Sequence, residues 1–195
     1  MTSGQYSLVL ASQSPRRVEL LRQIQIPFIQ RPVDIDETPA KDEKHELYVL
    51  RMALEKAKLG WQVGGKGDAV LGSDTAVVIQ GEILGKPKNQ QDSERMLTLL
   101  SDNTHQVLTA VALVTEKQHK HVVVETKVCF GPLSKKQMKW YWQTGEPQDK
   151  AGSYAIQGLG GQFVKHIQGS YSAVVGLPLY QTRMLLDGIG VINEC

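Results

Sequence analysis

The sequence has little cysteine and no long hydrophobic run. Its two cysteines are Cys129, inside an apolar stretch, and Cys195. Two cysteines cannot build the disulfide framework of a small secreted protein, which indicates a reduced, intracellular chain. No stretch approaches the ~20 apolar residues of a membrane helix. Residues 1–12 have neither the basic nor the apolar region of a signal peptide. We therefore expect a soluble, cytoplasmic protein.

Excess charge of one sign and aromatic residues are also scarce. The net charge is +2 and aromatic residues make up 6% of the chain. The sequence has no run of five basic residues and no basic stripe interleaved with aromatics, so we expect no nucleic-acid partner. The five histidines show no zinc-ligand spacing. The run from Gly64 to Gly67 lacks both the spacing and the hydroxyl of a P-loop.

What remains is the composition of an ordinary globular protein. With 195 residues, 41% of them hydrophobic, the chain can bury a core as a single domain over 1–195. Helix and strand patterns alternate, with two hairpins, and predict an α/β fold with a mixed sheet. The predicted strands cover 8–11, 26–33, 69–79, 82–84, 106–115, 121–130 and 162–167, and the helices 15–24, 43–59, 91–100, 134–144 and 178–186. A glycine-rich loop covers 151–161.

The first strand, loop and helix carry an unusual charge pattern. Ser14 is the expected N-cap, whose side chain accepts from the free amides of a helix that starts at Pro15. Arg16 and Arg17 then lie in the first turn, where the helix dipole disfavours cations. Hydroxyls, helix amides and two guanidinium groups in one loop predict a phosphate site. The alternative is an ordinary solvated helix start.

Two groups of carboxylates could take part in chemistry. Asp34, Asp36 and Glu37 form an acidic loop that is either solvated or provides Mg²⁺ ligands. Asp74 lies inside an apolar strand, where an unpaired carboxylate is costly to bury. Gly72, two residues before it, would allow another backbone or a ligand to approach closely. Asp74 is therefore either a hydrogen-bonded structural residue or a functional carboxylate, and we favour the functional role.

Three further polar residues are weaker candidates when taken alone. Lys56 lies on a predicted helix, where most lysines are solvated. Lys86 follows a strand, between a glycine and a proline that fix its direction. Gln157 is a single amide among glycine and apolar residues, in a run that is also typical of a simple turn.

Taken together, these motifs resemble the Maf family of nucleoside triphosphate pyrophosphatases. The match covers about 8–186, in the family's order. The matching motifs are LASQSPRR at 10–17, DET at 36–38, EKA at 55–57, GSDT at 72–75, GKP at 85–87, KAGSY at 150–154, IQG at 156–158 and VGLP at 175–178. The resemblance implies a curved mixed sheet with flanking helices, forming two lobes around a deep cleft. It also implies a homodimer and a divalent cation, Mg²⁺, Mn²⁺ or Co²⁺.

The resemblance further implies hydrolysis of a nucleoside triphosphate to the monophosphate and pyrophosphate, by attack of water at the α-phosphorus. In this interpretation Asp74 is the proton acceptor and, with Glu37, a metal ligand. The residues that match phosphate-binding positions are Ser12, Arg17, Lys56 and Lys86, and those that match base-selecting positions are Arg16, Thr75 and Gln157.

The chain resembles the subgroup of the family that acts on dTTP and UTP. Arg16 follows Pro15 where the 7-methyl-GTP subgroup has tryptophan, and Gln157 stands where that subgroup has glutamate. A carboxamide can pair with the adjacent acceptor and N3–H donor of uracil or thymine, whereas guanine presents adjacent donors that suit a carboxylate. The alternatives are a 7-methyl-GTP pyrophosphatase and a non-catalytic nucleotide-binding regulator of septum formation.

Overall fold

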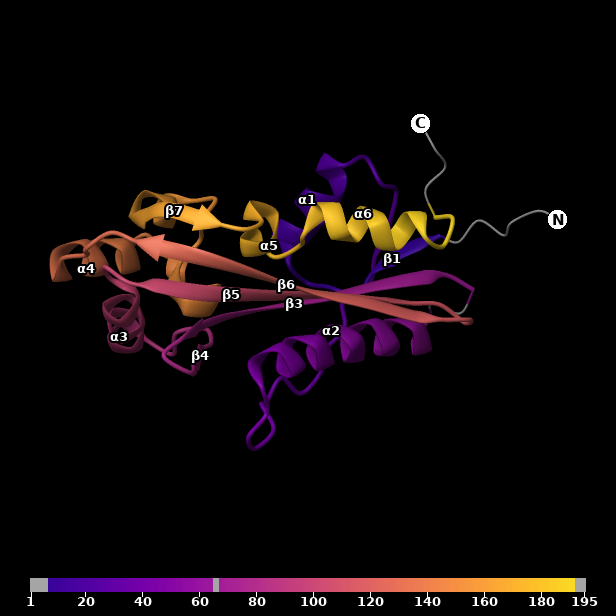
Figure 1. Ribbon diagram of the computed structural model, residues 1–195, viewed down its shortest axis with the longest axis horizontal. Coiled ribbons are helices and arrows are strands. Elements are labelled where there is room, and N and C mark those ends of the chain that lie inside the picture. Colours follow the sequence, from indigo (N-terminus) through magenta and orange to yellow (C-terminus); the bar gives the residue numbers. More distant parts are fainter. Residues whose placement is uncertain (1–6, 65–66, 192–195) are drawn as a thin grey trace. The chain divides into compact units, whose positions relative to one another are not determined.

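The structure is a computed structural model that describes residues 7–64 and 67–191. It contains a seven-stranded mixed sheet in the order β2-β1-β3-β5-β6-β7, with β4 paired to β3 (Figure 1). The strands are β1 (Leu8–Leu10), β2 (Ile29–Gln30), β3 (Ala69–Ile79), β4 (Glu82–Leu84), β5 (Thr104–Val114), β6 (His119–Phe130) and β7 (Val164–Gln168). The predicted α/β class and mixed sheet are confirmed.

Six α-helices and three short 3₁₀ segments accompany the strands in the described part of the chain. The helices are α1 (Pro15–Gln23), α2 (His45–Gln62), α3 (Gln90–Leu100), α4 (Lys135–Gln143), α5 (Tyr171–Val175) and α6 (Leu179–Asp187). The 3₁₀ segments are η1 (Glu146–Asp149), η2 (Ala151–Ser153) and η3 (Leu159–Phe163). No helix among the described residues is long and apolar enough to cross a membrane.

Some predicted elements were wrong in extent. The strand expected over 26–33 is reduced to Ile29–Gln30, because Pro27 and Pro32 flank it and proline cannot donate to a sheet. The glycine-rich run expected as a loop contains η2 and the start of η3. The short helix α5 had not been predicted. Predictions about residues 1–6, Lys66 and Cys195 concern positions outside the described residues.

By its internal contacts the chain divides into two compact units. Unit 1 comprises Met1–Asp74, Thr109–Val124 and Gly176–Cys195, and unit 2 comprises Thr75–Leu108 and Glu125–Val175. The boundary on β3 therefore falls between Asp74 and Thr75.

In unit 1, β1 pairs in parallel with both β2 and β3. Helix α2 lies on one face of the strands and α6 on the opposite face (Figure 1). At Gly72 on β3 a Cβ atom would overlap the Ala53 carbonyl oxygen and crowd the Ala57 amide of α2. Only glycine permits this close approach, which holds α2 against the strand that carries Asp74.

In unit 2, β3 forms the predicted hairpin with β4, and β6 pairs antiparallel with β7. Helix α4 opens with the predicted capping box, in which the side chains of Ser134 and Gln137 bond each other's backbone amides. Phe130, Tyr141 and Tyr154 belong to the main hydrophobic cluster of this unit. Cys129 is a half-buried free thiol.

Candidate active site

The loop before α1 is organised by Ser12 rather than by Ser14. Helix α1 starts at Pro15 and Ser14 occupies the N-cap position as predicted, but the Ser14 side chain makes no capping hydrogen bond. The predicted role of that side chain was therefore wrong. Instead, the buried Ser12 Oγ accepts from the Ser14 amide at 3.1 Å and from Arg17 Nη1 at 3.3 Å. Gln30 Nε2 donates to the Ser12 carbonyl at 3.0 Å, which joins this loop to β2.

Arg17 is half-buried and its direction is fixed at two atoms. In addition to the contact with Ser12, its Nε donates to the Gly176 carbonyl at 2.8 Å. Burial lowers the pKa of Arg17, and the Arg16 charge adds to this, although the Asp74 and Glu37 carboxylates act in the opposite direction. Arg17 therefore lies in the field of both predicted metal ligands, and its guanidinium remains charged.

Lys56 joins the two predicted metal ligands. Its Nζ lies 2.6 Å from Glu37 Oε1 and 2.7 Å from Asp74 Oδ1. The Lys56 and Asp74 side chains are 11% and 12% exposed, whereas that of Glu37 is 51% exposed. Lys56 is thus not the solvated helical lysine of the alternative interpretation, and the buried Asp74 is paired as its position requires.

The surroundings of Asp74 favour its protonated form more than water does. Burial raises the pKa of Asp74 and the Glu37 charge adds to this, while Lys56 and Arg17 oppose it. Burial, together with the negative charges of Asp74 and Glu37, raises the pKa of Tyr48 on α2 to about 12. A carboxylate with a raised pKa is a better proton acceptor than an ordinary aspartate, which suits a general base.

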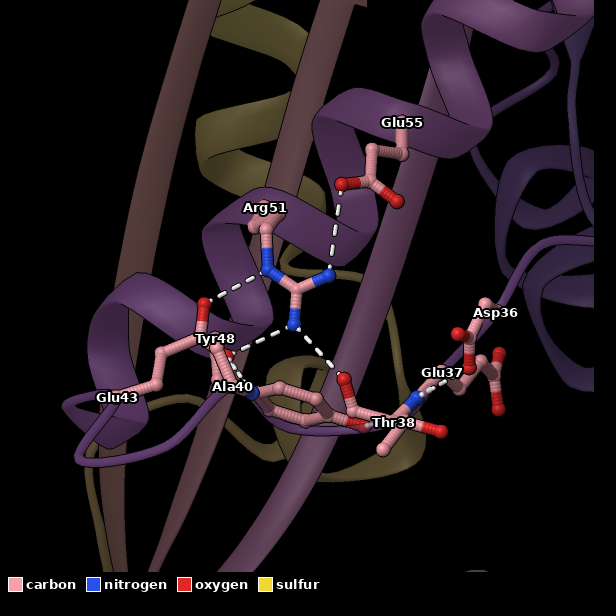
Figure 2. A network of polar contacts seen from close by, with 8 residues as sticks. All are labelled: Asp36, Glu37, Thr38, Ala40, Glu43, Tyr48, Arg51 and Glu55. Carbon is pink, nitrogen blue, oxygen red and sulfur yellow. Dashed lines mark hydrogen bonds and ion pairs between the residues drawn. The ribbon is translucent and has the colours of Figure 1, made fainter.

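The acidic loop has an internal structure that the sequence did not suggest (Figure 2). Tyr48 Oη donates to the Glu37 carbonyl at 3.0 Å. The Thr38 amide donates to Asp36 Oδ1 at 2.9 Å, and hydrogen bonds to Thr38 lower the pKa of Asp36. Asp36 therefore shapes its own loop, and Glu37 is the acidic residue of this loop that pairs with Lys56.

The structure thus brings five of the predicted site residues together within unit 1, namely Ser12, Arg17, Glu37, Lys56 and Asp74. Arg16 adjoins Arg17 and is half-buried. The other three belong to unit 2. Thr75 is half-buried directly after Asp74, and Lys86 and Gln157 are exposed.

The loop that carries Gln157 is held by a carboxylate that sequence reasoning missed. Glu146 accepts from the Leu159 amide at 2.9 Å and the Gly160 amide at 2.9 Å. It also accepts from Tyr141 Oη at 2.6 Å. A Cβ at Gly158 would overlap the Glu146 carboxylate. The absence of a side chain at Gly158 therefore lets the backbone pass close to Glu146, a contact that sequence spacing does not reveal.

Two further residues of unit 1 were missed. Ser73 is fully buried, and its Oγ lies 2.8 Å from the Ala110 carbonyl and 3.1 Å from the Gly176 carbonyl. Gly176 has a φ of +131°, a conformation that favours glycine. Both residues lie in motifs that carried the resemblance, so the sequence marked their positions but not their function.

The donor set fits a hard divalent cation. Among the residues that the structure describes, no group of three or more His, Cys, Asp or Glu side chains could hold a metal ion. Glu37 and Asp74 nevertheless present two carboxylate oxygens to one cationic atom, Lys56 Nζ. Mg²⁺ is commonly bound by one or two carboxylates together with substrate phosphates and water, and the chemistry of Glu37 and Asp74 fits this pattern.

Comparison with known proteins identifies the family. The family model described as Maf-like protein matches residues 7–189. The chain belongs to the Maf family. The resemblance seen in the sequence motifs is therefore confirmed, and the match extends over both units.

Close relatives within the Maf family share one name. A protein of Pseudoalteromonas atlantica named dTTP/UTP pyrophosphatase is 54% identical over 191 residues, covering 96% of this chain and 100% of the relative. A protein of Colwellia psychrerythraea with the same name is 54% identical and covers 99% of this chain and 93% of the relative. The Ham1 protein of Staphylococcus aureus has a similar fold, with a TM-score of 0.55 at 14% identity, over 93% of this chain and 98% of that one.

Proposed function

We propose that this Maf-family chain hydrolyses dTTP and UTP to the monophosphate and pyrophosphate, by attack of water at the α-phosphorus. The observation that carries the proposal is the position of Lys56, whose ammonium bridges Glu37 and Asp74 in the field of Arg17. Alternating charges of this kind can bind both the phosphates of a nucleoside triphosphate and a divalent cation, whereas two carboxylates without a cation would repel the phosphates. Relatives of 54% identity named dTTP/UTP pyrophosphatase support the same activity.

The cationic residues have the task of binding and neutralising phosphate. Arg17 has a fixed orientation, because its Nε and Nη1 are held by Gly176 and Ser12. We assign phosphate contacts to Arg17, Lys56, Ser12 and, from unit 2, Lys86. Pre-oriented donors of this type stabilise the charge that develops on a leaving pyrophosphate without reorganising during the reaction.

Asp74 has the task of accepting the proton of the attacking water. Burial raises its pKa, and Lys56 holds its Oδ1 in place. Glu37 and Asp74 would hold the divalent cation, Mg²⁺, Mn²⁺ or Co²⁺. When bound, such a cation neutralises phosphate charge and lowers the pKa of water.

We assign base selection to Arg16, Thr75 and Gln157. The Gln157 carboxamide can both donate and accept, as uracil and thymine require. Glu146 accepts hydrogen bonds from two backbone amides of the loop that carries Gln157, which restricts the position of that loop. Guanine would leave polar groups of the base and of Gln157 without a hydrogen-bond partner, which would cost about 1–3 kcal/mol of binding free energy. This predicts preference for dTTP and UTP over 7-methyl-GTP.

The test is pyrophosphate release from dTTP, UTP, CTP and 7-methyl-GTP with Mg²⁺ or Mn²⁺, using wild type and Asp74→Asn. We expect dTTP and UTP to be the best substrates and the variant to lose at least about 99% of turnover with its fold intact. Asp187→Asn, which alters an exposed ion pair with Arg183 on α6, is the matched control. Nucleotide binding without hydrolysis would instead favour a regulator of septum formation, and preference for 7-methyl-GTP would favour the other subgroup.

Three broader expectations belong to the same proposal. We propose that the two units form one cooperative domain, which requires a single unfolding transition by both fluorescence and circular dichroism. A homodimer requires twice the 21.6 kDa chain mass in light scattering. Cytoplasmic location requires recovery of the protein in the soluble fraction of its own cells, without association with nucleic acid or membrane.

A further inference from the structure

Glu37 lies on a segment with few means of holding its shape. Residues 31–44, between β2 and α2, contain no regular secondary structure, and most of 34–42 is exposed. The Glu37 side chain is half-exposed, yet its carboxylate lies 2.6 Å from Lys56 Nζ. Exposed loops without packed side chains sample many conformations. A specific contact must therefore restrict this loop to the conformation that brings Glu37 to the site.

Arg51, on α2, provides the strongest such contact (Figure 2). Its Nε lies 2.7 Å from Glu43 Oε1 and its Nη2 lies 2.8 Å from Glu43 Oε2. The same Nη2 donates to the Thr38 carbonyl at 3.1 Å. A bidentate arginine–carboxylate pair is directional as well as strong. One guanidinium group therefore holds both the end of the loop and the residue next to Glu37.

Two further contacts close the loop around Arg51. Glu43 Oε2 accepts from the Ala40 amide at 3.0 Å, so the carboxylate that binds Arg51 also fixes the loop backbone. The Arg51 guanidinium carbon lies 5.8 Å from the centre of the Tyr48 ring, whose hydroxyl donates to the Glu37 carbonyl. Figure 2 shows the contacts that lead from Glu43 through Arg51 to Thr38, which follows Glu37 directly in the chain.

We propose that Arg51, through Glu43 and Thr38, is a positioning residue that holds Glu37 beside Lys56 and Asp74. This rests on the proposed function, in which Glu37 is a metal ligand. Arg51 acts on Glu37 through the loop, since it donates to the carbonyl of the adjacent residue, Thr38, at 3.1 Å. When Arg51 is removed, the Glu37 carboxylate remains in the chain but occupies its position for a smaller fraction of the time.

A double-mutant cycle between Arg51→Met and Glu37→Gln tests this relationship. We expect Arg51→Met to raise, about 10-fold, both the Mn²⁺ concentration for half-maximal dTTP hydrolysis and the Mn²⁺ dissociation constant of the nucleotide-free protein by electron paramagnetic resonance. In the Glu37→Gln background, Arg51→Met should change neither value by more than about 2-fold. Equal effects of Arg51→Met in the two backgrounds would overturn the proposal, because Arg51 would then not act through Glu37.

Matched variants separate positioning from simple destabilisation. Arg51 contacts Glu55 as well as Glu43. Arg95→Met likewise removes an arginine that contacts two carboxylates, Asp92 and Glu82, and it should leave Mn²⁺ binding unchanged. Arg51→Lys keeps the charge without the planar pair, so it should rescue Mn²⁺ binding at most partly. If Arg51→Met does not fold, Glu43→Gln tests the same contact and should weaken Mn²⁺ binding by about 3- to 10-fold.

Failure of this inference is distinguishable from failure of the proposed function. A wild-type protein that releases no pyrophosphate from any nucleotide contradicts the proposed function. A wild-type protein that is active, and an Arg51→Met variant that is folded and has unchanged Mn²⁺ binding, contradict the inference alone.

Discussion

Arg17 and Ser73 share one hydrogen-bond acceptor. Arg17 Nε lies 2.8 Å, and Ser73 Oγ 3.1 Å, from the carbonyl oxygen of Gly176. Ser73 precedes Asp74 on β3 and Arg17 lies in the first turn of α1. A single carbonyl group thus aligns the candidate phosphate-binding guanidinium with the strand that carries the candidate base.

Gly176→Ala should weaken nucleotide binding, because the φ of +131° at this position is unfavourable for a side chain. Strain of this type costs about 1–3 kcal/mol, and relaxing it rotates the carbonyl away from Arg17. We expect a roughly 10-fold rise in the KM for dTTP, measured by pyrophosphate release. Gly190→Ala is the control, since Gly190 has a φ of +71° with no neighbouring atom within 4 Å of an added Cβ. An equal rise in KM in that variant would contradict the role of the Gly176 carbonyl.

Lys56→Met should remove turnover and steepen the fall of stability with rising pH. Glu37 and Asp74 would lose their shared cation, and breaking a buried pair costs about 3–5 kcal/mol. The pKa of Asp74, already raised by burial, should rise further. The folded variant then binds more protons than the unfolded chain, so its stability falls as pH increases.

Urea unfolding of Lys56→Met at pH 5 and pH 8 measures this effect. Lys56→Met/Asp74→Asn, which has no buried carboxylate at position 74, should regain stability at pH 8. No recovery in the double variant would show that the cost of Lys56→Met does not come from an unpaired Asp74.

Glu146→Gln should relax base selection. The carboxylate holds the backbone amides of Leu159 and Gly160, and a carboxamide can replace only part of that acceptor capacity. Because Gln157 lies on this loop, we expect the ratio of kcat/KM for dTTP to that for 7-methyl-GTP to fall roughly 10-fold. A fall in kcat with unchanged selectivity would contradict this assignment. Glu125→Gln, which changes an exposed carboxylate on β6 that accepts from Gln106, is the control.

The buried His105 should make folding sensitive to mild acid. Its Nε2 is paired with Tyr154 Oη at 2.8 Å, and burial lowers the pKa of the ring from 6.5 to about 4. The unfolded chain binds more protons between these values, so stability falls as pH decreases from 6.5 toward 4. The difference corresponds to about 3 kcal/mol. Urea unfolding at pH 7 and pH 4.5 should show a smaller drop for His105→Gln than for wild type or for His166→Gln.

The sequence predicted those parts of the site that depend on local pattern. The start of α1 at Pro15 and the burial of Asp74 follow from proline placement and from an apolar strand. Lys56 alone could not be distinguished from a solvated lysine, because its partner Asp74 lies 18 residues away in the chain. The family resemblance, rather than helical spacing, selected it.

The rest depended on tertiary contacts that no local pattern encodes. The Ser14 side chain was predicted to cap α1, but it makes no capping hydrogen bond. The Ser12 hydroxyl instead accepts a hydrogen bond from the Ser14 amide. Arg51 was not among the predicted site residues, because its contact with the Thr38 carbonyl forms only where the preceding loop folds back on α2. The catalytic, phosphate-binding, base-selecting and metal-binding roles of all the predicted site residues remain predictions, as does the divalent cation.

The division of unit 1 into three stretches of the chain determines when its contacts can form during synthesis. During synthesis every residue of unit 2, which ends at Val175, is incorporated before Gly176 is added. A nascent chain of that length already carries Lys56 and Asp74 but not the carbonyl that orients Arg17. The candidate phosphate-binding arginine is therefore aligned only after all of unit 2 has been synthesised, and a chain that stopped at Val175 would lack this contact.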